Sequence, residues 1–464
     1  MIRRTVLEWK TLRHGDGEDC IPEAVAKRIA AVARVSALAG DGGTCVVTHL
    51  RDGLRAEQVV GVVAAEGCAL EILPKIEGLG EAGDDISRGK IRKRLVYMLA
   101  VANDLDIASG SVTELGWQRD NLLEILIGLF SRKLSDAVRQ GMPRRYVACA
   151  DDLPALRGRL DVMRQFTALA ADPGRLACRY DALSADITIN QVMKAAVTQL
   201  ARISQNEATQ RRLRELGFVY AEVTAVFPPS LNWAGLVFDR SSARWRELVD
   251  LARLLLGYRF QTTSGGDTRG FSLLFEMNKL FEQYVERLLK RAVVGSGLTA
   301  HGQSGLRYCL QEIEAPYTHR FQTRPDILIK RGNETVLIID TKWKRISARI
   351  DDPKQGVAQA DVYQMMAYGR IYDCPRLMLL YPWHAGLAQP AGITARHRIA
   401  QDGCNDQLIT ATVDVSATHD AAISALRKLV IGESLTLATQ IGSGRPENRV
   451  LAEWGLASGG SGIL

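Results

Sequence analysis

The stretch RPDILIKRGNETVLIIDTKWK, residues 324–344, decides how the C-terminal part of the chain folds. Two apolar runs, ILI and VLII, are rich in β-branched residues, and they flank the turn-forming pair Gly332-Asn333. This pattern predicts a β-hairpin. We take its loop as three residues, 332–334, although the sequence is also compatible with a loop of two.

In the three-residue register, Asp326 lies opposite Asp340, and Lys342 shares a strand face with Asp340. A slip of one residue would scatter these three side chains. Two adjacent carboxylates repel each other, so one must hold a proton or a cation must bind both. Their oxygens suit Mg²⁺, which can polarise a phosphodiester, while Lys342 can orient or deprotonate a water. The hairpin thus predicts a site for phosphodiester hydrolysis; the alternative is an exposed strand with alternating charges.

A second element follows the hairpin in DVYQMMAYGRIY, residues 361–372, which has a helical pattern. Gln364 and Tyr368 are four residues apart and share one helix face. Together with the two aspartates and the lysine, this Gln-x-x-x-Tyr pattern resembles the PD-(D/E)xK nuclease superfamily, in particular its RecB-like branch. The resemblance implies that Gln364 and Tyr368 lie beside the carboxylates and contact the substrate or a metal-bound water.

Residues 271–293 are predicted as one long helix that precedes the hairpin. The superfamily often has a helix-borne acid that reaches the metal, so the resemblance implies Glu282 as a third ligand beside Asp326 and Asp340. Glu276 is the competing acid, and a solvated glutamate is the alternative for both.

The resemblance extends to McrC-type nuclease subunits of McrBC-type modification-dependent restriction systems. It rests on FEMNKLFEQYV (275–285), RPDILI, IIDTKWK, LEILPKI (70–76), LRGRLD (156–161) and LSADITIN (183–190). Such proteins cut DNA, and a partner AAA+ GTPase ring of McrB type reads the modified base and translocates the DNA. The resemblance implies that the N-terminal part docks on this ring and stimulates GTP hydrolysis. In agreement, the sequence has no Gly-x-x-x-x-Gly-Lys-[Ser/Thr] phosphate-binding loop.

The expected protein is therefore a Mg²⁺-dependent endodeoxyribonuclease that acts on double-stranded DNA with a McrB-like ring. Two alternatives remain. One is a non-catalytic adaptor that only activates the GTPase ring, and the other is a RecB-like nuclease that works without that motor.

The expected fold is α/β and multidomain. We predict a β-rich module at residues 1–85, a mainly helical region with a β-hairpin insert and partner docking at 86–265, a PD-(D/E)xK nuclease domain with a mixed sheet at 270–440, and a tail at 441–464. The Gly-rich stretch TTSGGDTRG, residues 262–270, is predicted as a linker that few contacts cross.

Basic residues gather in the middle of the chain, where residues 86–165 hold fourteen Lys and Arg against nine acids. They indicate contact with DNA phosphates or with the ring, and a solvated helical surface is the alternative. Arg157 and Arg159 share one side of a predicted strand and are the best candidates for partner contact, with Arg144 and Arg145 as further candidates.

Composition excludes several classes of protein. The 464 residues are 47% hydrophobic and 24% charged, with a formal net charge of +7, which is typical of a globular protein. No apolar run reaches the roughly 18 residues of a membrane span, and residues 1–10 lack a signal-peptide core, so we expect no membrane contact and a cytoplasmic location. The eight cysteines form no Cys-x-x-Cys pair, which argues against a disulfide framework and a zinc site.

Overall fold

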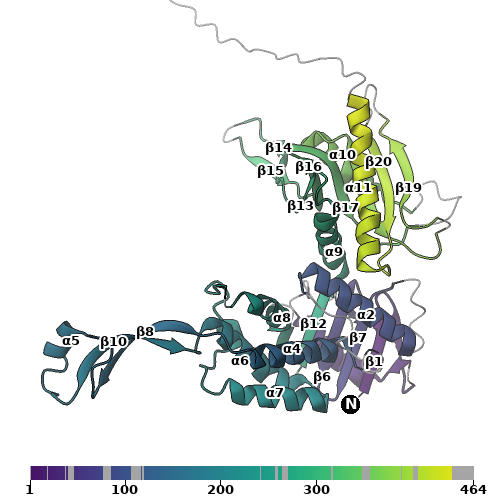
Figure 1. Cartoon of the computed structure of the whole chain (residues 1–464). Helices are drawn as coiled ribbons and strands as arrows, with labels where there is room; N and C mark the ends of the chain where they lie inside the picture. Colours follow the sequence, from purple (N-terminus) through teal and green to yellow (C-terminus); the bar gives the residue numbers. More distant parts are fainter. Residues whose placement is uncertain are drawn as a thin grey trace, which may run out of the picture.

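The computed structural model shows two bodies connected by helix α9 (Met277–Ala292), with a long arm leaving one of them (Figure 1). The lower body comprises the described residues up to 276 other than the arm, and the upper body comprises the described residues from 277 to 441. The structure describes residues 2–17, 19–36, 38–39, 46–76, 85–105, 117, 120–240, 242–256, 260–263, 270–314, 317–346, 356–387, 389–400 and 406–441. The predicted tail, 441–464, lies almost entirely outside the described residues.

The lower body is built on a five-stranded sheet of order β1-β7-β6-β12-β11. Its strands are β1 (Ile2–Leu7), β7 (Cys68–Leu73), β6 (Val59–Ala65), β12 (Gly270–Glu276) and β11 (Phe260–Thr263). Helix α1 (Glu23–Arg34) packs on β6, beside a small sheet of β3 (Cys20–Ile21), β2 (Thr11–His14), β5 (Gly53–Ala56) and β4 (Val47–His49). The strands among the described residues 1–85 agree with the β-rich module predicted there.

The prediction of one helix over residues 271–293 is wrong in its first part. Residues 270–276 form β12, which pairs antiparallel with β6, and the helix begins only at Met277. Leu273, Leu274 and Phe275 are all buried, because this strand is covered on both faces. A strand buried on both faces reads as a continuous apolar run, which periodicity does not separate from a buried helix.

This strand also corrects the predicted linker at residues 262–270. Thr262 and Thr263 lie in β11 and Gly270 begins β12, while residues 264–269 lie outside the described part of the chain. Both strands belong to the lower sheet, so the chain passes into the upper body at Met277 instead. As independently folding units, the ranges 1–85, 86–265 and 270–440 stay a prediction.

Helices cover the lower sheet and confirm the helical middle of the chain. They are α2 (Asp85–Ala102), α4 (Leu122–Arg139), α6 (Thr188–Ile203), α7 (Glu207–Val219) and α8 (Arg246–Leu256). Asn121 precedes α4 and its side chain accepts a hydrogen bond from Glu124 N, which satisfies a free donor at the helix start.

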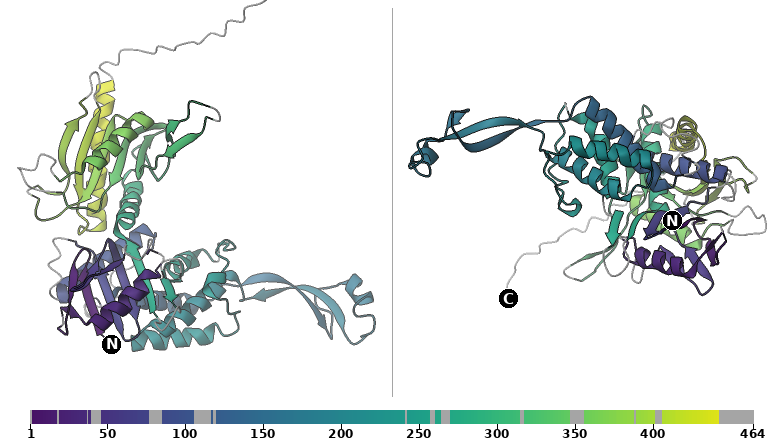
Figure 2. Two further views of the ribbon diagram at one scale, coloured as in Figure 1. Left: turned by 180° about the vertical axis from the view of Figure 1, so that it is seen from behind. Right: turned by 90° about the horizontal axis from the view of Figure 1, so that it is seen from below.

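The β-hairpin insert predicted within residues 86–265 is a long arm. Strands β8 (Arg145–Leu153) and β10 (Leu176–Ser184) form a long antiparallel ladder, and the short β9 (Arg159–Leu160) pairs with β10. Helix α5 (Val162–Phe166) lies at the far end, and the arm extends well away from the lower body (Figure 2).

The upper body confirms the expected mixed sheet. Its strand order is β13-β16-β17-β18-β20-β19, where β17, β18 and β20 run parallel and the outer pairs are antiparallel. The bounds are β13 (Thr299–Gly302), β16 (Ile327–Arg331), β17 (Glu334–Thr341), β18 (Arg376–Pro382), β20 (Gln407–Val413) and β19 (Ile393–Arg398). Helix α10 (Gln359–Tyr372) covers one face, while α9 and α11 (His419–Ile441) cover the other. A separate hairpin, β14 (Tyr308–Gln311) and β15 (His319–Gln322), projects from this body (Figure 1).

The hairpin of β16 and β17 has the predicted strand register near the aspartates, but its loop differs from the predicted one and a bulge compensates for the difference. Its loop has two residues, since Arg331 pairs with Glu334, so the assumed three-residue loop is wrong. A β-bulge then shifts the register by one residue, and Ile329 pairs with Leu337 while Ile327 pairs with Ile339. Beyond the bulge the pairing is the predicted one, and it continues towards Asp326 and Asp340.

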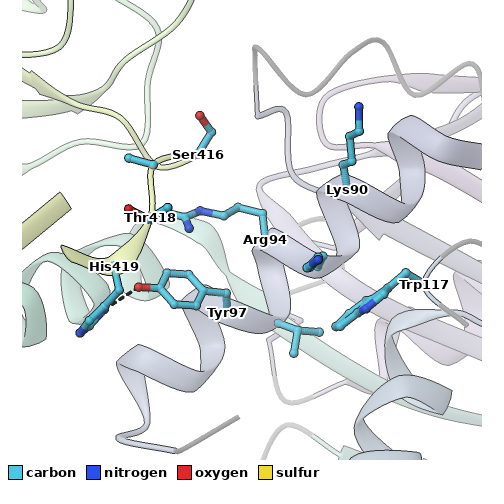
Figure 3. A pocket seen from close by; sticks show the side chains of 10 residues that line it. Lys90, Arg94, Tyr97, Trp117, Ser416, Thr418 and His419 are labelled. Carbon is cyan, nitrogen blue, oxygen red and sulfur yellow. Dashed lines mark hydrogen bonds between the residues drawn. The ribbon is translucent and has the colours of Figure 1, made fainter. Parts of the chain in front are cut away.

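Several contacts join the two bodies, contrary to the expectation of a sparse boundary. Arg94 Nη2 donates to Tyr284 Oη at 2.8 Å, and Tyr97 Oη lies 2.5 Å from His419 Nδ1. A pocket of about 350 Å³ opens between α2 and the turn before α11 (Figure 3). Among the helices of the described residues, none is long and apolar enough to cross a membrane.

Candidate active site

The two aspartates of the hairpin lie at one end of the upper sheet, on the face that α10 covers. Asp326 directly precedes β16, and its Oδ2 accepts hydrogen bonds from Thr341 N and Thr341 Oγ1, both at 2.8 Å. Asp340 is the next-to-last residue of β17 and is 1% exposed. Leu328 and Ile338 pair across the hairpin and pack towards α10, which places Asp326 and Asp340 on that same face.

Lys342 is the centre of the site. Its Nζ lies 2.7 Å from Asp340 Oδ2 and 3.5 Å from Asp361 Oδ1, and it donates to Gln364 Oε1 at 3.2 Å. Burial lowers the pKa of Lys342, but the charges of Asp340, Asp361 and Asp326 outweigh burial and leave this pKa above its ordinary value. Lys342 is therefore held as a cation against the carboxylates.

Helix α10 brings the two predicted polar residues to the same place. Gln364 Nε2 donates to Tyr368 Oη at 2.9 Å, and Tyr368 Oη donates to Arg324 O at 3.3 Å. A continuous chain of contacts thus runs from Asp340 through Lys342 and Gln364 to Tyr368. All five predicted catalytic residues converge at this end of the sheet, although their catalytic roles stay a prediction.

Sequence reasoning missed Asp361, which is buried in the first turn of α10. Besides its contact with Lys342, its Oδ2 accepts from Lys344 Nζ at 3.2 Å, so this carboxylate holds two lysines of the IIDTKWK motif. The signal was present in the sequence: Asp361 precedes Gln364 by three residues, which puts both on one helix face.

The structure distinguishes the two candidate acids, Glu282 within α9 and Glu276 just before it. Glu282 accepts a hydrogen bond from Gln303 Nε2 at 2.8 Å, and after burial its charge is the next cause that raises the pKa of Asp326. Burial and the nearby Glu286 and Asp340 raise the pKa of Glu282 itself. Glu276 instead lies at the start of α9 in an ion pair with Lys279. Of the two, Glu282 is the one whose charge acts on the aspartates.

Asp326 and Asp340 are buried beside other acidic side chains, which disfavours their charged forms. Burial raises the pKa of both Asp326 and Asp340, and the neighbouring charges of Glu282 and Asp326, respectively, raise them further. No group of three or more His, Cys, Asp or Glu side chains is arranged to hold a metal ion within the described residues. Mg²⁺ commonly uses one or two carboxylates and keeps several waters, so the two carboxylates Asp326 and Asp340 have the chemistry that suits this ion.

The predicted partner-contact residues belong to the arm and not to this site. Arg145 begins β8 with Arg144 just before it, and Arg159 begins β9; these side chains are exposed. Arg157 precedes β9, and its guanidinium lies 4.0 Å from the centre of the Tyr180 ring. The expectation that Arg157 and Arg159 share one strand is therefore wrong, because the turn at Gly158 separates them, with φ of 69°.

The basic stretch is also not one continuous surface. Arg92 is buried, and its Nη2 lies 2.8 Å from Glu71 Oε2. Arg92 Nη1 also donates to Trp117 O at 3.0 Å, so this arginine contributes to the core of the lower body.

Comparison with known proteins matches most of the chain to one protein family. Residues 54–382 match the family described as McrBC 5-methylcytosine restriction system component. The chain belongs to this family. Among curated proteins, it is 18% identical over 254 residues to the type IV methyl-directed restriction enzyme EcoKMcrBC of Escherichia coli (strain K12), covering 54% of this chain and 72% of that protein.

Two solved structures share the fold of this McrBC-family chain. One is a chain of the half-complex from a tetradecameric assembly of Thermococcus gammatolerans McrB AAA+ hexamers with bound McrC. It has a TM-score of 0.65 and 19% identity, and the match covers 93% of this chain and 99% of that one. The other, from the Thermococcus gammatolerans McrBC complex, has a TM-score of 0.50 and 22% identity over 63% of this chain and 88% of its own.

Proposed function

We propose that this chain is a Mg²⁺-dependent endodeoxyribonuclease of the PD-(D/E)xK type. It cleaves modified double-stranded DNA as the nuclease subunit of a McrBC-like restriction system. The observation that carries the proposal is the convergence of Lys342 with Asp340 and Gln364 beside Asp326 at one end of a mixed sheet. This set combines carboxylates for a hard cation with a lysine fixed next to them.

Each side chain has a definite task in this proposal. Asp326 and Asp340 would hold Mg²⁺, which polarises the phosphodiester and acidifies a bound water when it is present. Lys342 places a positive charge where the phosphate gains negative charge in the transition state. Gln364 limits the rotation of the Lys342 side chain, and Tyr368 orients Gln364 in turn. Pre-organisation of this kind lowers the barrier because no reorientation is needed during the reaction.

The proposed partner is a McrB-like AAA+ GTPase ring whose hydrolysis this chain stimulates. Support comes from the fold shared with the Thermococcus gammatolerans assembly of McrB hexamers with bound McrC. The arm supports docking because apolar side chains are exposed at its far end. They are Leu156, Val162, Met163 and Phe166. Exposed apolar residues of this size on a projecting element indicate a protein contact.

The first test is cleavage of DNA carrying 5-methylcytosine by the full chain with its partner ring, GTP and Mg²⁺. We expect Asp340→Asn to abolish cleavage, because a lost metal carboxylate removes several kcal/mol of transition-state stabilisation. Asp373→Asn is the matched control: Asp373 is exposed at the end of α10 in a left-handed conformation that asparagine also tolerates. If Asp340→Asn cuts at the parental rate, the nuclease assignment is wrong.

The same reaction separates the adaptor alternative from the nuclease. An adaptor would stimulate GTP hydrolysis by the ring in both the parental and Asp340→Asn forms, and neither form would cut DNA. In the proposed function, Asp340→Asn still stimulates GTP hydrolysis and loses only cleavage. A nuclease without that motor would cut equally well with and without the ring.

A further inference from the structure

The segment that carries the proposed catalytic lysine is tied directly to the lower body. Trp343 follows Lys342 and is 7% exposed, and its indole Nε1 donates to Glu8 Oε1 at 2.7 Å. Glu8 lies in the turn after β1 and is 1% exposed. This hydrogen bond joins residues 335 positions apart, from two different bodies.

Glu8 is itself held firmly by the lower sheet. The same Oε1 accepts from Lys75 N at 2.9 Å, and Glu8 N donates to Leu73 O at 2.9 Å, so the turn is fixed to the end of β7. The next residue, Trp9, has φ of 65°, a left-handed conformation that L-residues rarely adopt. The lower sheet therefore presents this carboxylate in one defined position.

Burying this carboxylate is unfavourable, which argues that its contact has a purpose beyond packing. Burial raises the pKa of Glu8, and the hydrogen bonds from Trp343 and Lys75 counter this effect only in part. Its second oxygen, Oε2, is buried without a hydrogen-bond partner among the described residues. An apolar residue would fill the space at lower cost, whereas a carboxylate fixes the rotation of the indole.

The position of Trp343 affects the position of Lys342, because the two residues are neighbours in the segment that follows β17, and β17 ends at Thr341. Three contacts fix this short segment. Lys342 N donates to Leu380 O at 2.9 Å on the upper sheet, and the Trp343 indole is held by Glu8 while its ring lies 5.3 Å from the ring of Phe281.

We propose that Glu8 is a positioning residue of the nuclease site: through Trp343 it sets the place of Lys342 against Asp340, and so makes catalysis depend on the position of the lower body. This inference rests on the proposed nuclease function. A misplacement of about 1 Å at a reacting group can reduce the rate by up to about a hundredfold, so a small shift of the lower body suffices.

The test compares two changes at Glu8 in the full chain. Glu8→Leu removes the acceptor, whereas Glu8→Gln keeps an oxygen that can accept from the indole. We expect Glu8→Leu to reduce the cleavage rate constant at saturating DNA by about tenfold or more, with the DNA concentration at half-maximal rate unchanged. Glu8→Gln should restore most of the rate. Trp343→Phe should resemble Glu8→Leu, and the double variant should be no slower than either single one, because both changes break the same contact.

Tyr97→Phe is the matched control because it breaks a different contact between the bodies, the one with His419. We expect it to cut at the parental rate. The thermal unfolding temperature of each variant is also measured, because it distinguishes a lost positioning contact from a general loss of folded structure. Equal rate losses in Glu8→Leu and Tyr97→Phe, or a loss in Glu8→Leu that follows its loss of stability, would overturn the proposal.

A readout without cleavage keeps this test separate from the proposed function. Lysines are dimethylated with ¹³C, and the Lys342 signal is assigned with Lys342→Arg. We expect Glu8→Leu to shift the Lys342 signal and Tyr97→Phe to leave it in place. An unchanged Lys342 signal in Glu8→Leu refutes the positioning role whether or not the parental protein cuts DNA. A shifted signal in a protein that cuts no DNA refutes only the nuclease assignment.

Discussion

Asp361→Asn tests the role of the carboxylate that binds two lysines of the site. Asp361 Oδ1 lies 3.5 Å from Lys342 Nζ. Two unit charges at this separation attract by about 5 kcal/mol at an effective dielectric constant of about 20. In Asp361→Asn, Lys342 still contacts Asp340 at 2.7 Å and Gln364 at 3.2 Å. The cost of removing both charges from water also cancels much of the attraction between Lys342 and Asp361. We therefore expect the free energy of unfolding of the variant to fall by about 1–2 kcal/mol.

The effect on catalysis follows from the freedom that Lys342 gains. About 1.4 kcal/mol of lost positioning corresponds to a tenfold decrease in rate, so we expect cleavage to slow by about tenfold. The pH dependence has a defined sign. Asp361 contributes to raising the pKa of Lys342, so its removal lowers that pKa, and Lys342 loses its proton at a lower pH.

The assay is cleavage of methylated DNA by the full chain and its partner ring across a series of pH values. We expect the alkaline decline of the rate to begin at a lower pH in Asp361→Asn than in the parental protein, with Asp373→Asn as the control. A parental rate together with an unchanged alkaline decline would refute the reasoning that Asp361 controls Lys342.

Three further predictions concern the metal, the core and the arm. Burial raises the pKa of Asp326 and Asp340 to about 6, so protons compete with Mg²⁺ for these carboxylates as the pH falls. Calorimetric titration should therefore show weaker Mg²⁺ binding at about pH 6 than at about pH 8. Equal affinities at the two pH values would argue against this pair as metal ligands. Arg92→Leu leaves the buried Glu71 carboxylate unpaired and should cost about 3–5 kcal/mol, measured by denaturant unfolding; a cost under about 1 kcal/mol would contradict a buried ion pair. Met163→Asp, at the exposed end of the arm, should weaken binding to the partner ring with little change in thermal stability, and unchanged binding would move the docking surface elsewhere.

The sequence predicted which residues meet at the site better than it predicted the loop, the bulge and the strands that bring them together. Asp326, Asp340 and Lys342 were placed on one face because strand alternation is strict. The two-residue turn would have put them out of register, and only the bulge opposite Ile329 and Lys330 restores it. A bulge depends on the packing of both strands, which a pattern of residue types does not encode.

Strand β12 and the contact of Glu8 with Trp343 could not be predicted from the sequence, because both depend on segments that are far apart in the chain. β12 has a long-range partner, β6, and nothing local in FSLLFE separates a fully buried strand from a buried helix. Glu8 could not be linked to Trp343 because their contact depends on how the two bodies meet. Asp361 is different, since its helical spacing to Gln364 was visible and was not used.

The pairing of β6 with β12 has a consequence for synthesis of the chain. Ala65 pairs with Gly270, so the centre of the lower sheet stays unfinished on the ribosome until the helices and the whole arm have emerged. Until then, β6 has one open edge, and its sequence VVGVVAA is apolar on both faces. Contacts between such distant segments form slowly, so nascent chains that end before residue 276 should aggregate and require a chaperone.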